Sequence, residues 1–361
     1  MEDNMKRCLA LTAVLALLML FAGCALPTGK DEVIPDTTSR IGEAENTVAS
    51  DQNTSDKTTG SESDSKENGI DVSENALMTP VTLYYQDVDG YLIPMTRWVD
   101  KQPGIARAAL NGLTDSAITR EELQYYGVYP ILPVDTEVLG INIKDGIATV
   151  DFNGRLMEYG NEDIEKSIVA SVVYTLTEFS TISSVKLQVN GKALDTMKYG
   201  TKVSGLLSRS NVPINSTLDK GSKKADIFYF KRSNEGFTFL LPVSVKIKDS
   251  EEITPNLLVK QLLLEKTDTK LISEMPAGAE LLNCTNNSGV LLVDFDEKFL
   301  DYGGNAREEG LLKQLVYTVR QSGGISKVKI NINGEAAQLP EGTYISSGIA
   351  IPRTINDIID R

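Results

Sequence analysis

The chain has 361 residues, a formal net charge of -14, three cysteines and no histidine. This length is enough for two ordinary domains. The absence of histidine excludes Ser-His-Asp and Cys-His catalysis and histidine-ligated zinc, because each of these needs an imidazole. Three scattered cysteines are too few for a zinc site or a disulfide framework, so an enzyme made from this chain would have to use carboxylates, lysine or tyrosine.

The N-terminus has the pattern of a secreted precursor. Lys6 and Arg7 form a short basic start, and the apolar run LALTAVLALLMLFAG has the length of a signal-peptide core, shorter than a membrane span. It ends in LFAGC, which resembles the bacterial lipobox. The resemblance implies removal of residues 1–23 as a lipoprotein signal peptide and lipid attachment at Cys24, on the extracytoplasmic face of the cell membrane. The alternative is an uncleaved anchor helix.

Residues 24–79 have a different composition from the rest of the chain. Stretches such as TSDKTTGSESDSKENG are rich in Ser, Thr, Asp, Glu and Gly, and no aromatic residue occurs in this segment. Such a segment buries too little apolar surface to offset the entropy of ordering, so we expect a disordered, lipid-anchored linker. More than half of the net negative charge lies here, and the acidic balance argues against nucleic acid as a partner.

The remainder of the chain repeats itself. GIATVDFNGRLMEYG, starting at Gly146, returns as GVLLVDFDEKFLDYG, starting at Gly289, and residues 146–194 align with residues 289–337 without a gap. A repeat of this length indicates a duplicated domain. We therefore predict two tandem domains, at residues 80–216 and 222–361.

Each copy predicts the same order of elements. An opening strand (81–85 or 225–230) precedes a first helix, which has Pro103 in its first turn in one copy and Thr254 as its N-cap in the other. A hairpin, joined across a Lys-Asp-Gly turn in copy one, leads to a long helix, with Asn161 as N-cap in copy one and a capping box from Asn305 to Glu308 in copy two. A closing strand follows. The pattern β-α-β-β-α-β predicts a small α+β sandwich, with two helices on one face of one sheet.

The long helices carry an apolar stripe that both copies keep. In the first copy the stripe has helical spacing and consists of Ile168, Val169, Val172, Val173 and Leu176. Every aligned position in the second copy is also apolar, which indicates a helix face packed on a sheet.

The repeated signature raises the question of chemistry. Its residues are Asp151, Phe152, Tyr159 and Gly160 in the first copy and Asp294, Phe295, Tyr302 and Gly303 in the second. A catalytic reading would pair the aspartates with the aligned acids Glu158 and Asp301. We interpret the aspartates as structural. Strand alternation turns Asp151 away from Val150 and Phe152, so its carboxylate can accept hydrogen bonds from the amides of a turn. No catalytic residue and no metal site are predicted.

The first copy contains an insertion. The segment from Thr114 to Pro133 is longer than its counterpart and holds Tyr125, Tyr126 and Tyr129. Tyrosines in a long loop are candidate anchors for a protein partner. The alternative is that they cover an exposed edge of the first domain.

The lipobox, the polar linker and two copies of a unit containing LPVDTEVL or MPAGAELL, IATVDF or LLVDF, and VKLQVNG or VKINING resemble the GerM family of sporulation and germination lipoproteins, which carry tandem GerMN domains. The resemblance implies a fold similar to the ring-building modules of secretion systems. It also implies a non-enzymatic assembly protein of the envelope complex between mother cell and forespore. Its partners would be the membrane, envelope proteins and, as a further expectation, copies of itself in a homo-oligomer, with no cofactor beyond the lipid on Cys24.

Two other functions stay open. One is a carboxylate-based cell-wall hydrolase or a wall-binding accessory factor. The other is a solute-binding lipoprotein, although repeats of this size are small for the two lobes of such a protein.

Overall fold

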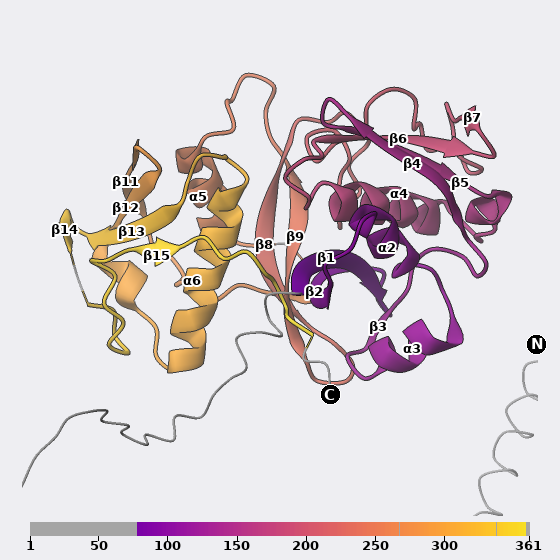
Figure 1. Cartoon of the computed structure of the whole chain (residues 1–361). Coiled ribbons are helices and arrows are strands. Elements are labelled where there is room, and N and C mark those ends of the chain that lie inside the picture. The colour runs from indigo at the N-terminus through magenta and orange to yellow at the C-terminus, as the bar shows by residue number, and fades with distance from the viewer. Residues whose placement is uncertain (1–77, 267, 337, 359–361) are drawn as a thin grey trace, which may run out of the picture. The chain divides into compact units, whose positions relative to one another are not determined.

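A computed structural model describes residues 78–358 apart from residues 267 and 337. The predicted signal peptide, Cys24 and all but the last two residues of the predicted linker lie outside the described residues. Strands and helices alternate through two similar repeats, called here the first repeat (residues 78–216) and the second repeat (residues 222–358), which belong to one compact body (Figure 1). The predicted α+β class and the tandem duplication are confirmed.

The elements of the first repeat are β1 (Met78–Asp87), β2 (Leu92–Asp100), α2 (Ile105–Asn111), α3 (Ala117–Gln124), β3 (Val128–Tyr129), β4 (Val138–Lys144), β5 (Ile147–Phe152), η1 (Gly154–Met157), α4 (Glu162–Leu176), β6 (Ser184–Val189) and β7 (Lys192–Ala193). Those of the second repeat are β8 (Lys224–Arg232), β9 (Thr238–Lys246), α5 (Pro255–Leu263), β10 (Leu271–Ile272), β11 (Leu281–Asn287), β12 (Val290–Phe295), η2 (Glu297–Leu300), α6 (Asn305–Arg320), β13 (Lys327–Ile332), β14 (Glu335–Ala336) and β15 (Ile349–Ala350).

Each repeat has two sheets where the sequence predicted one. In the first repeat the sheets have the strand orders β2-β1-β3 and β4-β5-β6-β7, and in the second β10-β8-β9 and β11-β12-β13-β14, with β15 on β13. The hairpin strands β4 and β5 are antiparallel, and β6 joins β5 in parallel after the crossover through α4. The predicted single sheet is therefore wrong, because the opening strand belongs to a sheet of its own.

Both repeats open with a two-stranded hairpin, and the prediction of a single opening strand is also wrong. Pro94 and Pro242 stand in the middle of β2 and β9, opposite Tyr84 and Phe228. A proline cannot donate to a ladder and argues against a central strand. It is tolerated here because β2 and β9 are the edge strands of their sheets.

The long helices are buried on more than the predicted stripe. In α4 every residue from Ile168 to Leu176 is buried, as expected for a helix enclosed between two layers. Its second face bonds the opening strand: Ser171 Oγ donates to the Tyr84 carbonyl oxygen at 2.6 Å, and Tyr84 N donates to Thr175 Oγ1 at 3.2 Å. These side chains bond backbone groups of Tyr84 in β1 at a point where β3, which pairs with Gln86 and Asp87, does not reach.

The second repeat keeps this arrangement with one different side chain. Gln314 Nε2 donates to the Phe228 carbonyl oxygen at 2.8 Å, and Phe228 N donates to Thr318 Oγ1 at 3.1 Å. The pairing makes Phe228 the counterpart of Tyr84, so strands β1 and β8 align residue by residue. The hairpins themselves lie next to each other, with β2 in contact with β9 (Figure 1).

Local signals at helix starts have mixed outcomes. Asn161 caps α4 as predicted, accepting from Ile164 N at 2.9 Å, and Thr254 caps α5. The predicted capping box of α6 is wrong: Gly304 is the N-cap, with a φ of 95°, and Glu308 turns into the protein. The inserted segment of the first repeat, predicted as a loop, contains α3, whose N-cap Ser116 accepts from Thr119 N.

Candidate functional site

The repeated aspartates hold the turn that follows the closing strand. Gly191 N donates to both carboxylate oxygens of Asp151, at 2.9 and 3.0 Å, and Gly334 N donates to Asp294 Oδ1 at 2.8 Å. Both glycines stand second in an Asn-Gly turn with positive φ. Each aspartate thus ties the end of β5 or β12 to the turn after its parallel neighbour.

The repeated tyrosines lead to a buried carboxylate that the sequence analysis did not single out. Tyr159 Oη donates to Glu165 Oε2 at 2.6 Å, and Tyr302 Oη donates to Glu308 Oε2 at 2.9 Å. Glu165 is fully buried and Glu308 is 2% exposed. Both repeats have glutamate at this aligned position, whereas the neighbouring positions differ between the repeats. This identity could have marked the two glutamates in the sequence.

Backbone donors complete both carboxylate sites. Tyr199 N and Thr201 N donate to Glu165 at 2.6 and 2.8 Å, whereas Glu341 N and Thr343 N donate to Glu308 at 2.9 and 3.3 Å. Burial opposes ionisation of Glu165, but the hydrogen bonds outweigh it and hold the pKa of the carboxyl below its usual value. The pKa of Glu308 is lowered for the same reason. An ionised, fully bonded glutamate in each repeat fastens the long helix to a distant loop.

The remaining signature residues and acids form no paired carboxylate site. Phe152 and Phe295 are fully buried, and Gly160 accepts at its carbonyl oxygen from Tyr199 Oη at 2.7 Å. Gly303 precedes the Gly304 cap of α6. The acids of the catalytic reading are exposed: Glu158 pairs with Arg155 at 2.7 Å, and Asp301 ends η2. Within residues 78–358 as described, no group of three potential metal ligands comes together.

The inserted tyrosines contact the second repeat. The Tyr125 and Tyr126 rings lie edge-on to each other and 5.1 and 5.2 Å from the Phe237 ring, which belongs to the β8–β9 turn. A side chain at Gly127 would come within 3.1 Å of Ser233 Cβ in the same turn. Tyr129 pairs in β3 with Gln86 and is 37% exposed. We call Tyr125, Tyr126 and Phe237 the aromatic clamp.

The second repeat grips the β1–β2 turn with charge. Lys231 Nζ lies 2.7 Å from Asp89 and 3.2 Å from Asp87, and Lys270 Nζ lies 2.6 Å from Asp89. Tyr91 Oη donates to Asp268 in the same place. Hydrogen bonds from the two lysines hold the pKa of Asp89 below its usual value. We call the residues of this group the ionic clamp: Asp87, Asp89, Tyr91, Lys231, Asp268 and Lys270.

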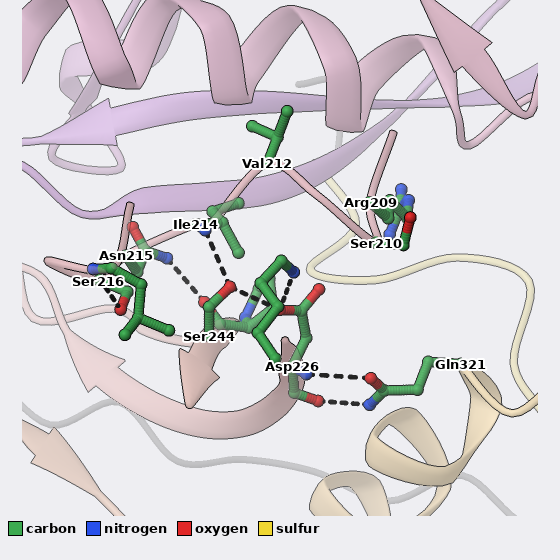
Figure 2. A network of polar contacts seen from close by, with 12 residues as sticks. Arg209, Ser210, Val212, Ile214, Asn215, Ser216, Asp226, Ser244 and Gln321 are labelled. Carbon is green, nitrogen blue, oxygen red and sulfur yellow. Dashed lines mark hydrogen bonds and ion pairs between the residues drawn. The ribbon is translucent and has the colours of Figure 1, made fainter. Parts of the chain in front are cut away.

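A polar network around Asp226, at the start of β8, joins the repeats away from these two clamps (Figure 2). Tyr174 Oη, on α4, donates to Asp226 Oδ2 at 2.6 Å, and Lys224 Nζ lies 2.7 Å from Asp226 Oδ1. Ser244 Oγ also donates to this carboxylate, at 2.6 Å, while Gln321 bonds the Asp226 backbone at both N and O. Lys224 is buried, and this burial lowers the pKa of its ammonium group. The Asp226 carboxylate is thus bound by Tyr174 of the first repeat and by Lys224 and Ser244 of the second.

A cleft of about 490 Å³ borders this network. Glu178 lies at its wall, paired with Arg209 at 2.6 Å and with Arg320 of the second repeat at 3.1 Å, and it accepts from Tyr84 Oη at 2.9 Å. Burial opposes ionisation of Glu178, but both arginines outweigh it and hold the pKa of the carboxyl below its usual value. The polar side chains of this wall therefore come from both repeats and already form hydrogen bonds and ion pairs with one another.

The two repeats can be compared with known families. The family described as Germane, sporulation and spore germination, matches residues 82–195 and 227–338, which together are more than half of the chain. The chain belongs to the Germane family. Both matched stretches run from the opening strand to just past the closing strand. The loops that bind Glu165 and Glu308, and the tails that follow, lie beyond them.

Most of this chain is similar to known proteins. The spore germination protein GerM of Bacillus subtilis (strain 168) is 28% identical over 287 residues, which are 76% of this chain and 77% of that protein. The solved tandem GerMN domains of the sporulation protein GerM from Bacillus subtilis are similar with a TM-score of 0.68 and 26% identity, over 77% of this chain and 99% of that structure. This protein is accordingly a sporulation- and germination-related protein with tandem domains.

Proposed function

We propose that the protein is a lipid-anchored, extracytoplasmic assembly protein of the sporulation envelope complex between mother cell and forespore, which acts by docking other envelope proteins onto its tandem domains. The observation that carries the proposal is the use of the repeated polar residues. Asp151, Tyr159, Glu165 and their equivalents all bond within their own repeat. Residues so engaged support a rigid binding scaffold, and the GerM relatives are named for sporulation and germination.

The hydrolase alternative requires two carboxylates at a separation that suits glycoside cleavage, on one open surface. Asp151 is tied to Gly191, and Glu158 pairs with Arg155. We therefore expect the purified mature protein to release no muropeptides from peptidoglycan. Measurable release would favour the hydrolase over the assembly protein.

The anchor is tested by Cys24→Ala. None of the helices in the described part of the chain is long and apolar enough to cross a membrane. If lipid on Cys24 holds the protein, the variant should leave the membrane fraction while its domains stay folded. Retention of an unlipidated variant in that fraction would contradict the proposed anchor.

The assembly role is tested in sporulating cells of the producing organism. Deletion of the gene should reduce the yield of mature spores, and the intact gene should restore it. The Cys24→Ala variant should restore it poorly, because the freed protein no longer stays beside its partners. Proximity labelling from the intact protein should mark envelope proteins of the sporulating cell; labelling indistinguishable from an unrelated lipoprotein would contradict docking.

A further inference from the structure

The two repeats exchange their C-terminal tails. The first tail (residues 211–216) pairs with β9 of the second repeat: Ile214 N donates to Ser244 Oγ at 2.9 Å, and Ser244 N donates to the Ile214 carbonyl oxygen at 2.9 Å. The second tail (residues 351–358) pairs with β2 of the first repeat. There Ile355 N donates to Thr96 Oγ1 at 2.9 Å, and Thr96 N donates to the Ile355 carbonyl oxygen at 3.0 Å.

An asparagine follows each of these isoleucines and bridges the two edge strands. Asn215 accepts from Leu92 N at 2.6 Å and donates to the carbonyl oxygens of Leu92 and Pro242, each at 2.8 Å. Asn356 accepts from Leu240 N at 3.0 Å and donates to the carbonyl oxygens of Leu240 and Pro94, each at 2.7 Å. Both asparagines have positive φ, at 51° and 48°, which asparagine tolerates better than most residues.

These contacts have the reciprocity of a twofold interface. In such an interface residue i of one subunit contacts residue j of the other, and j contacts i in return. Leu92 and Pro94 are the counterparts of Leu240 and Pro242 in the hairpin register. The first asparagine binds Leu92 and Pro242, whereas the second binds Leu240 and Pro94, so the repeats meet as the two halves of a symmetric dimer would.

Charge departs from this symmetry at a buried point where two equivalent residues meet. The strand alignment through Tyr84 and Phe228 makes Asp87 the counterpart of Lys231, and these two residues form an ion pair with each other at 3.2 Å. Their side chains are 2% and 5% exposed. Equivalent residues that meet lie close to the pseudo-twofold axis, where a pair of identical repeats would place two like charges together.

We propose that this surface is a heterospecific docking surface, on which the first repeat binds the second repeat and neither binds itself. If two first repeats met through this surface, Asp87 and Asp89 of one would face Asp87 and Asp89 of the other, and Lys231 would be missing from the pairing. A pair of second repeats would set Lys231 against a second buried Lys231. Buried like charges without a partner disfavour both wrong pairings. A homo-oligomer that uses this surface must then join the first repeat of one chain to the second repeat of another.

The test uses the whole chain with a protease site inserted at Asp219, which is exposed in the connection between the repeats. After cleavage the halves should elute together from a size-exclusion column with the mass of the uncleaved protein. Separation of the halves at micromolar concentration would overturn the proposal. Native mass spectrometry should find one N-terminal and one C-terminal half in each particle. When isotope-labelled and unlabelled cleaved proteins are mixed, no particle should contain two N-terminal halves or two C-terminal halves. Particles with two like halves would also overturn the proposal.

The role of the buried charge is tested by Lys231→Asp in the same cleavable chain. Exchange of labelled halves should become at least tenfold faster than in the parent, whereas Lys270→Asp, which changes a cation 55% exposed on the same Asp89, should change it little. Exchange at the parent's rate in Lys231→Asp would overturn the charge-based specificity. If circular dichroism shows that the uncleaved Lys231→Asp chain is unfolded, Lys231→Met is read in its place by the same criterion.

Discussion

The two clamps occupy related places in the repeats but use different chemistry. In each repeat the segment after the first helix holds the hairpin turn of the other repeat. The first repeat does so with Tyr125 and Tyr126 packed on Phe237, and the second with Lys270 and Asp268 beside Asp89 and Tyr91. A duplicated architecture therefore fixes where the halves must touch, while the side chains that make the contact are free to diverge.

The same comparison extends to the buried centre of the interface. Asp87 and Lys231 are equivalent by strand register yet opposite in charge, and Glu178 and Gln321 are equivalent by helix alignment yet bond different groups. Glu178 takes two arginines, whereas Gln321 bonds the Asp226 backbone. Of these divergent residues, Asp87, Lys231 and Glu178 contact the other repeat, whereas Gln321 bonds Asp226 of its own repeat. The signature residues, which bond within a repeat, stay the same.

The largest expected effect is on the buried cation of the ionic clamp. Lys231→Met removes the buried counter-charge of Asp87 and leaves Asp89 paired with Lys270. Breaking a buried ion pair by removing one partner costs about 3–5 kcal/mol. Urea unfolding monitored by circular dichroism measures the loss. Lys270→Met is the matched control, because its exposed pair with Asp89 should contribute below about 1 kcal/mol. Equal losses in the two variants would contradict the difference in burial.

The buried glutamates should come next. Glu165→Gln keeps the size of the side chain but places an amide group against backbone and tyrosine donors, which should cost about 2–3 kcal/mol. Glu308→Gln should cost less, since its bond from Thr343 N is longer, at 3.3 Å. Unfolding free energies of the two single variants test this order. A larger loss in Glu308→Gln would show that bond length does not rank the two sites.

The same glutamates predict a pH dependence. Their pKa values are lower in the folded protein than the ordinary value of 4.5, so their stabilisation is fully present above pH 4.5 and is lost as pH falls through the folded value. The melting temperature of the parent should therefore fall more steeply below pH 4.5 than that of Glu165→Gln, and the two curves should approach each other. Parallel curves down to pH 3 would contradict this assignment.

A smaller loss is expected from the aromatic clamp. Replacing Tyr125 and Tyr126 with Ser removes two ring contacts to Phe237 and should lower stability by about 2 kcal/mol, with little dependence on salt. Tyr129→Ser, outside the clamp, is the control. Binding of an outside partner by these tyrosines stays a prediction. Weaker capture of envelope proteins by the folded double variant would support it, and unchanged melting with lost capture would favour docking over packing.

The smallest effect should come from the repeated aspartates. Asp151→Asn retains one acceptor oxygen where two now accept from Gly191 N, and we expect a loss of about 1 kcal/mol. Asp294→Asn should lose less, because only one oxygen accepts from Gly334 N. Thermal unfolding measures both. A variant that melts like the parent but no longer supports sporulation would instead revive a chemical role for these carboxylates.

Some features of the protein are local enough to be determined by sequence alone. The Asp145-Gly146 turn, the Asn161 and Thr254 caps and the helix stripe depend on residues within a few positions of one another, so the pattern predicts them directly. The duplication is visible because the two segments can be compared letter by letter without knowledge of the fold. The absence of histidine likewise limits the chemistry without any knowledge of the fold.

Other features were decided only when distant segments met. Pro94 argues against a strand until β2 is known to be an edge, and Glu165 resembles an exposed first-turn acid until residues 199–201 close over it. The meeting of Asp87 with Lys231 depends on how the two repeats pack, and neither residue's neighbours in the chain carry that information. Burial and partner choice are properties of the packed surface, so the tertiary structure alone turned these ordinary charged residues into the centre of an interface.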